Sequence, residues 1–140
     1  MDLAFTAPTP DLVPAFDLVL EHGSVAIVGA IATGGVRSHH PITGGSFSGE
    51  GLSGTVTGGS ETWLDRADGV TMVEASYYIT FADGAVARCF GQGYRTAGAS
   101  TRLALLFEAA EDGSVAGLAT RAFLGERVEG STRLVISRIV

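Results

Sequence analysis

The sequence predicts an all-β fold, an antiparallel closed β-barrel of about eight to ten strands, and three observations lead to it. Twenty of the 140 residues are glycine, and most of them bracket short runs rich in the strand formers Val, Ile, Thr, Phe and Tyr. Hairpin-type dipeptides separate these runs at Asp68-Gly69, Asp83-Gly84 and Asp112-Gly113. The glycine pairs Gly44-Gly45 and Gly58-Gly59 indicate further turns or bulges. Short strands joined by short loops favour closure, which leaves no exposed sheet edge.

Residues 1–14 are expected to form an extended arm, because three of the four prolines of the chain fall there. Residues 15–140 are expected to form a single β-barrel domain, since this length fits one compact domain. The first strand begins where the arm ends, and its alternation places Phe16, Leu18 and Leu20 on one face.

The remaining strands follow the same alternation between turn signals. Residues 103–110 could also form a helix, because Leu, Ala and Glu are good helix formers, but their length matches that of the neighbouring strands. We expect strands at residues 36–42, 46–47, 52–57, 62–64, 70–81, 85–90, 102–110, 119–128 and 133–140.

The segment Val25–Ile31 differs from the other runs because it is apolar on both faces. A strand buried on both sides of a barrel wall needs a cover outside as well as inside. A second subunit is the simplest cover, so we expect a homodimer with this segment at or near the interface.

Composition argues against several kinds of partner and cofactor. The basic residues are nine arginines against fifteen acidic residues, a formal net charge of −6, which disfavours nucleic acid. One cysteine, Cys89, and three histidines offer too few ligands for a metal site, and no dinucleotide or phosphate motif indicates a cofactor. No apolar stretch reaches the ~18 residues of a membrane span, and residues 1–14 lack the pattern of a signal peptide, so we expect a cytoplasmic protein.

Residues Gly34–Gly59 carry a spaced pattern: an arginine ahead of a Pro-Ile-x-Gly-Gly-x-Phe-x-Gly core, then Leu-x-Gly-x-Val and a glycine pair. This pattern resembles the bacterial domain of unknown function 3237 family, and the resemblance covers about residues 15–140. It implies an antiparallel β-barrel, lipocalin-like or allene-oxide-cyclase-like in appearance. The resemblance assigns no biochemical role.

Several positions match that family and others depart from it. Arg37 matches the arginine ahead of the core, and Tyr77 matches a strand tyrosine. The tryptophan is displaced by one position, to Trp63. Ser38 and Ser76 stand where relatives carry arginine, so the resemblance does not bring an anionic-ligand contact to this chain.

Glu61 and Glu74, on neighbouring predicted strands, are the candidate general acid and base, and Tyr77 is the third candidate catalytic residue. Burial in a dry barrel would raise the pKa of a carboxyl group toward neutrality, where it transfers protons best. The alternative is that both glutamates are solvated residues of the outer face. Alternation leaves the choice open, because Glu74 shares a face with Tyr78 whereas Tyr77 lies on the more apolar face.

Trp63, Tyr78 and Arg88 are expected to bind the substrate, the indole by stacking and the other two by polarising an oxygen. Arg88 lies in an apolar run, so its charge needs a partner, for which Glu74 or Glu108 is available.

His40 and Arg37 complete the candidate binding residues. His40 shares its face with apolar positions and is either a satisfied interior histidine or a proton shuttle. His39 points to the opposite face, so the adjacent histidines cannot share a metal. Arg37 also lies on that opposite face and is a candidate partner for a carboxylate at the dimer interface.

We interpret the chain as a small-molecule-binding barrel and a cofactor-free enzyme of the isomerase, cyclase or lyase type, acting on a hydrophobic or polyketide-like substrate. The alternative is a non-catalytic carrier of hydrophobic ligands, or a structural barrel filled by its own side chains. The enzyme hypothesis predicts that the candidate residues meet in one concave pocket, namely Glu61, Glu74, Tyr77 or Tyr78, Arg88 and Trp63.

Overall fold

The structure, a computed structural model, describes residues 8–140. Residues 1–7, half of the predicted arm, lie outside the described residues. The first strand begins at Leu12, within the predicted arm, because Leu12 and Val13 already pair with Ile139 and Arg138 at the end of the chain.

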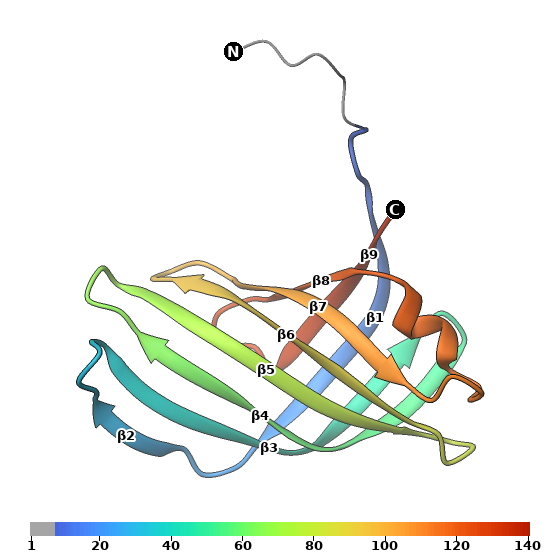
Figure 1. The fold of residues 1–140 in the computed structure, drawn as a ribbon, viewed down its shortest axis with the longest axis horizontal. Coiled ribbons are helices and arrows are strands. Elements are labelled where there is room, and N and C mark those ends of the chain that lie inside the picture. Colours follow the sequence, from blue (N-terminus) through green and yellow to red (C-terminus); the bar gives the residue numbers. More distant parts are fainter. Residues whose placement is uncertain (1–7) are drawn as a thin grey trace.

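The described residues form nine strands and one short 3-10 helix (Figure 1). In chain order these are β1 (Leu12–His22), β2 (Ala26–Ala30), β3 (Val36–Gly49), β4 (Leu52–Asp65), β5 (Val70–Phe81), β6 (Val86–Thr96), β7 (Thr101–Ala109), η1 (Ala116–Thr120), β8 (Phe123–Arg127) and β9 (Arg133–Ile139).

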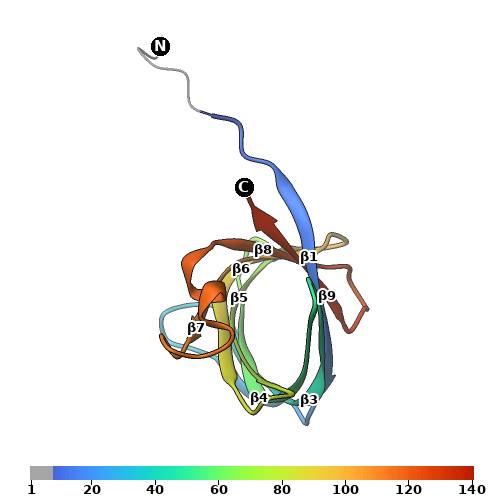
Figure 2. The same ribbon diagram turned by 90° about the vertical axis from the view of Figure 1, so that its right-hand side faces the viewer.

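The sheet closes on itself, which confirms the predicted antiparallel barrel. Its strand order is β1-β9-β8-β7-β6-β5-β4-β3-β2. β1 also pairs with the second part of β3, from Ile42 to Ser48, and this pairing closes eight strands into a ring (Figure 2). β2 stays outside the ring and pairs with the first part of β3, from Val36 to His39.

β3 and β4 are longer than the sequence predicted, because each continues through a glycine pair that was expected to separate two runs. Gly45 and Gly59 have φ values of +139° and +138°, a region that favours glycine. A Cβ atom would lie 1.9 Å from the carbonyl oxygen of Val19 at the first position and 2.2 Å from that of Ser76 at the second. These glycines bend long strands around the barrel instead of ending them.

The segment that could have formed a helix is the strand β7, whose Leu103, Leu105 and Phe107 alternate into the core. The strand predicted at residues 119–128 is wrong in its first part, where η1 forms and β8 begins only after it. Leu118 of η1 is buried against the core, so this turn covers one end of the barrel.

Phenyl rings fill the barrel at the end that η1 covers. Phe16 and Phe47 pack with their ring centroids 4.6 Å apart, and Phe107 and Phe123 meet edge to face at 5.0 Å. Phe81 adds a further edge contact to Phe47 at 5.5 Å. Core side chains therefore fill this half of the barrel interior. The buried polar side chains lie in the other half.

Candidate functional site

The barrel half opposite η1 holds four polar or amphipathic side chains that touch one another, Glu61, Trp63, Tyr77 and Arg127, which we call the polar cluster. Glu61 and Trp63 are two residues apart in β4 and therefore face the same side of the sheet. Tyr77 comes from β5, which pairs with β4, and Arg127 ends β8 across the barrel. Glu61 and Tyr77 are fully buried, and Arg127 is 6% exposed.

Glu61 accepts four hydrogen bonds within this cluster. Arg127 binds it in bidentate fashion, with Nη1 2.7 Å from Oε2 and Nη2 2.9 Å from Oε1. The indole Nε1 of Trp63 donates to Oε1 at 3.0 Å, and the hydroxyl of Tyr77 donates to Oε2. Both carboxylate oxygens are therefore saturated by donors.

This environment keeps Glu61 ionised. Burial by itself would raise the pKa of the carboxyl group, but the hydrogen bonds and charge of Arg127, with the bonds from Tyr77 and Trp63, outweigh it and lower the pKa to about 2. Burial and the same carboxylate raise the pKa of Tyr77 well above 10.0. A saturated, ionised Glu61 orients its neighbours, and this geometry does not suit the proton-transfer role that the sequence suggested for it.

His40 stands beside the cluster on β3, half-buried. Its ring stacks on Trp63 with centroids 3.9 Å apart and planes 23° apart, and its Nε2 lies 2.9 Å from the hydroxyl of Ser38. Burial lowers the pKa of His40 below its ordinary 6.5, against the opposing charge of Glu61. His40 is therefore a neutral imidazole at pH 7, able to accept a proton.

Arg95 of β6 approaches the same indole. Its guanidinium carbon lies 4.5 Å from the ring centroid of Trp63, a cation–π distance. His40 stacks on the same indole, so Trp63 lies in contact with both side chains. Within residues 8–140, no carboxylate lies within 4.0 Å of Arg95. This charge is available to an anionic group of a ligand.

Sequence reasoning missed both arginines of this site. Arg127 follows Phe123 and Gly125 on the buried face of β8, so alternation could have identified it as an interior charge in need of a partner. Arg95 follows Cys89 on the inward face of β6 in the same way.

The predicted single pocket is wrong, because the candidate residues divide between the two faces of the barrel wall. The inward set and the outward set are separated by alternation on β4, β5 and β6. Facing inward are Glu61, Trp63, Tyr77 and His40, and facing outward are Glu74, Tyr78 and Arg88.

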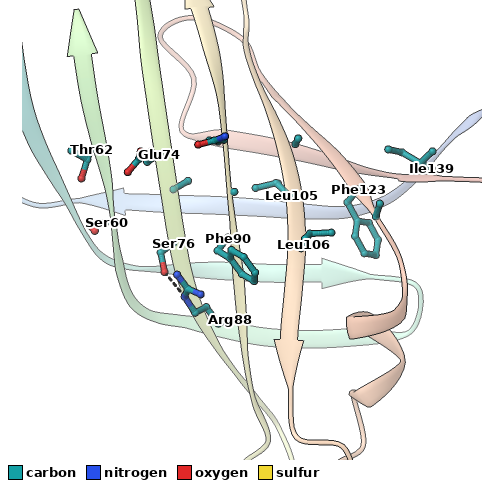
Figure 3. A pocket seen from close by; sticks show the side chains of 15 residues that line it. Ser60, Thr62, Glu74, Ser76, Arg88, Phe90, Leu105, Leu106, Phe123 and Ile139 are labelled. Atoms are coloured by element: carbon teal, nitrogen blue, oxygen red, sulfur yellow. Dashed lines mark hydrogen bonds between the residues drawn. The ribbon is translucent and has the colours of Figure 1, made fainter. Parts of the chain in front are cut away.

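The outward residues Glu74 and Arg88 line a groove of about 640 Å³ across β4 to β7 (Figure 3). Arg88 is held on its floor by Ser76 at 2.9 Å, by Glu108 at 2.7 Å, and over the ring of Phe90 at 4.3 Å. Of the two carboxylates considered for Arg88, Glu108 is its partner. Because Glu74 and Arg88 lie on the outer face of the wall, neither forms an acid–base pair with the interior residues.

Arg37 precedes Ser38 on β3 and so faces away from His40. It does not share the interior site with the other candidate binding residues. Cys89 is fully buried, and burial raises the pKa of its thiol, as expected for a core residue.

The described part of the chain contains no group of three His, Cys, Asp or Glu side chains placed to hold a metal ion. Among those residues there is also no helix with the length and apolar character that crossing a membrane requires.

Solved structures share this fold along almost the whole chain. A conserved protein of unknown function from Rhodopseudomonas palustris superposes with a TM-score of 0.83 at 25% identity, over 96% of this chain and 100% of that one. A β-barrel-like protein from Acinetobacter baumannii gives 0.82 at 20% identity, over 96% and 98%. A crystal structure of an enzyme from Penicillium herquei gives 0.83 at 23% identity, over 99% and 100%.

Sequence comparison gives the family. A UPF0311 protein from Rhodopseudomonas palustris (strain TIE-1) is 36% identical over 89 residues, which is 63% of this chain and 58% of that relative. The family model for the protein of unknown function DUF3237 matches residues 10–114, well over half of the chain. The barrel and its sequence thus place the chain in the DUF3237 family, as the resemblance at Gly34–Gly59 indicated.

Proposed function

We propose that this protein is a cofactor-free enzyme that moves a proton on a small, hydrophobic organic molecule bound at the polar end of the barrel. The reaction class is isomerisation, cyclisation or elimination, and a polyketide-like substrate with an acidic O–H or C–H group fits it. The proposal includes a cytoplasmic location.

The observation that supports this function best is the state of His40. It is neutral at pH 7, half-buried, and hydrogen-bonded to Ser38, whose hydroxyl either gives a proton to Nε2 or receives one from it. Because burial lowers its pKa below the ordinary 6.5, the imidazole is unprotonated and available as a base near neutral pH. His40 takes the role that the sequence assigned to Glu61 and Glu74.

Arg95 supplies the second requirement of such a reaction. Removing a proton from an O–H or C–H group leaves negative charge on oxygen, and a fixed cation beside it lowers the energy of that state. The guanidinium of Arg95 lies against Trp63, on which His40 also stacks. A ligand that reaches His40 at this end therefore also comes near the cation.

Glu61 acts as a positioning residue in this proposal. Its bond to the indole nitrogen fixes Trp63, and its bidentate pair with Arg127 fixes the carboxylate itself. His40, stacked on that fixed indole, is thereby held at a defined angle. Catalysis requires a reacting group to stay within a narrow range of positions, and hydrogen bonds to the residues that hold it restrict its movement in this way.

The Penicillium herquei enzyme has the same fold at 23% identity, so barrels of this shape accommodate catalysis in at least one protein. The second candidate function is a carrier or structural barrel. The phenyl rings that fill the η1 half favour the structural barrel, because they leave no room for a ligand there.

Fluorescence and isotope exchange distinguish these functions. Trp63 is the single tryptophan of the chain, so its emission reports on the proposed site alone. Substituted naphthols and aryl 1,3-diketones would be screened for quenching of Trp63, and each binder then incubated with the protein in D2O. Deuterium uptake or conversion detected by mass spectrometry is expected for the enzyme. Quenching without any chemical change indicates a carrier, and a panel without binders contradicts the enzyme and the carrier and favours the structural barrel.

A further inference from the structure

We propose that the ligand of the polar end is a hydrophobic carboxylic acid, bound as its anion by Arg95 at the rim of the barrel. The place of the ligand rests on the proposed function, and the chemical class goes beyond it. The carboxylate pairs with the guanidinium, and the hydrocarbon part of the ligand contacts the indole of Trp63, whose ring centroid lies 4.5 Å from the guanidinium carbon.

Five residues form a continuous row around this rim, one from each of the strands β4 to β8. They lie directly opposite one another in the sheet register, in the order Asp65, Thr71, Arg95, Thr101 and Arg127. β4 and β6 end, and β5 and β7 begin, at this end of the barrel, opposite η1 (Figure 1). Because opposite residues of antiparallel neighbours have Cβ atoms about 4.5–5.5 Å apart, the row is compact.

The charges of this row are separated along it. Asp65 lies on the β4 side, and the hydroxyl of Thr71, between Asp65 and Arg95, donates to its Oδ1 at 2.6 Å. Arg95 and Arg127 lie on the other side and flank Thr101, and Arg127 is neutralised by its bidentate pair with Glu61. An anion is therefore favoured beside Arg95 on the β6 side of the rim, away from Asp65.

The other arginines make the state of Arg95 exceptional in this chain. Six of the nine arginines each have a carboxylate within 4.0 Å. Of the three that have none among residues 8–140, Arg37 faces out of the barrel and Arg121 follows η1 at the opposite end. Arg95 faces inward and is half-buried. A partly desolvated cation gains most from an anionic partner, and a ligand carboxylate supplies the one that the chain does not.

The guanidinium can serve the carboxylate and the proposed reaction together. It carries five N–H donors, of which a carboxylate takes two in a fork. Arg95 can therefore hold the acid and still contact an oxygen that becomes negative during proton transfer. The neighbouring apolar surface is flat, because the rings of His40 and Trp63 stack with planes 23° apart. An aromatic acid fits such a surface and loses little conformational freedom on binding.

Calorimetric titration with 1-naphthoate and with 1-naphthamide tests this class, because the two probes share their shape and differ in charge. At pH 7 the wild type should bind the naphthoate about 10-fold more tightly than the amide, or better. Arg95→Met should weaken naphthoate binding by roughly 10-fold or more and change amide binding by less than about threefold. The matched control is Arg102→Met, because Arg102 follows Thr101 on β7, faces outward and pairs with Glu126 at 2.9 Å. Its loss should leave both affinities unchanged.

An unchanged amide affinity also shows that Arg95→Met is folded, and Arg95→Lys, which keeps the charge, should recover part of the preference for the naphthoate. Equal affinity of the wild type for both probes, or no binding of either, overturns the proposal, and so does a preference that survives Arg95→Met. Failure of the proposed function is seen separately. A preference for the naphthoate without deuterium uptake by any naphthol or diketone contradicts that function alone, and uptake without the preference contradicts the carboxylic acid alone.

Discussion

Replacing Glu61 by glutamine tests the polar cluster where its energetics are most sharply defined. The substitution keeps the shape of the side chain and removes its charge, so Arg127 remains buried without a counter-ion. Tyr77 and Trp63 lose a charged acceptor at the same time. Breaking a buried pair in this way typically costs about 3–5 kcal/mol.

The pKa of Glu61 gives a second route to the magnitude. The folded protein holds this pKa at about 2 instead of 4.5, so the ionised carboxylate contributes about 3 kcal/mol to the free energy of unfolding at pH 7. Because the folded pKa is the lower one, the contribution is complete above about pH 5 and is lost as the pH falls toward 2. The stability difference between wild type and Glu61→Gln should therefore shrink by about 2 kcal/mol between pH 7 and pH 3.

The assay is urea unfolding followed by far-UV circular dichroism at both pH values. Glu74→Gln is the control, because this glutamate is exposed on the outer face and its replacement should change stability by less than about 0.5 kcal/mol. The double variant E61Q/R127M should regain stability relative to Glu61→Gln, since it removes the orphaned charge. A loss below about 1 kcal/mol at pH 7, or a difference that does not change with pH, would refute the reasoning.

Three further predictions follow from individual contacts. The pKa of His40, measured by NMR titration, should lie below 6.5, and a value above 6.5 contradicts the neutral-base assignment. Because this pKa is lower in the folded than in the unfolded protein, His40 should lower the free energy of unfolding as the pH drops below 6.5. Gly59→Ala should cost more than about 2 kcal/mol in urea unfolding, because its Cβ would meet a backbone oxygen, whereas Gly117→Ala, with open space around it, should be nearly neutral. The thiol of Cys89 should react with Ellman's reagent only as fast as the protein opens, and fast labelling of native protein would show that it is accessible.

The sequence predicted the fold well because the relevant signals are local. Alternation at Phe16, Leu18 and Leu20 and the hairpin turns at Asp68-Gly69 and Asp83-Gly84 depend on neighbouring residues, and they reappear in the structure. Asp112-Gly113 instead leads from β7 into η1. The glycine pairs misled because positive φ serves a bend inside a strand as well as a turn between strands. At Gly45 and Gly59, the sequence distinguishes a bend inside a strand from a turn between strands only if one already knows that the strand continues.

The candidate site was predictable only in part. Alternation separates Glu74 from Tyr77, but which face points inward is decided by how the sheet closes. Glu61 and Arg127 are 66 positions apart in the sequence and pair across the barrel, so no local sequence pattern predicts their ion pair. His40 and Trp63 were identified as candidates from residue type and face, whereas their stacking depends on the register between β3 and β4.

The most direct test of the central claim is the effect of His40→Gln on binding and turnover of one compound, with Trp63 quenching as the binding signal. If His40 carries the proton, the dissociation constant should change by less than about threefold while turnover falls by roughly 100-fold or more. Wild-type turnover should rise with pH through a midpoint below 6.5, and that midpoint should vanish in the variant. Turnover that persists unchanged in His40→Gln, at equal affinity and with the same pH profile, would contradict the claim.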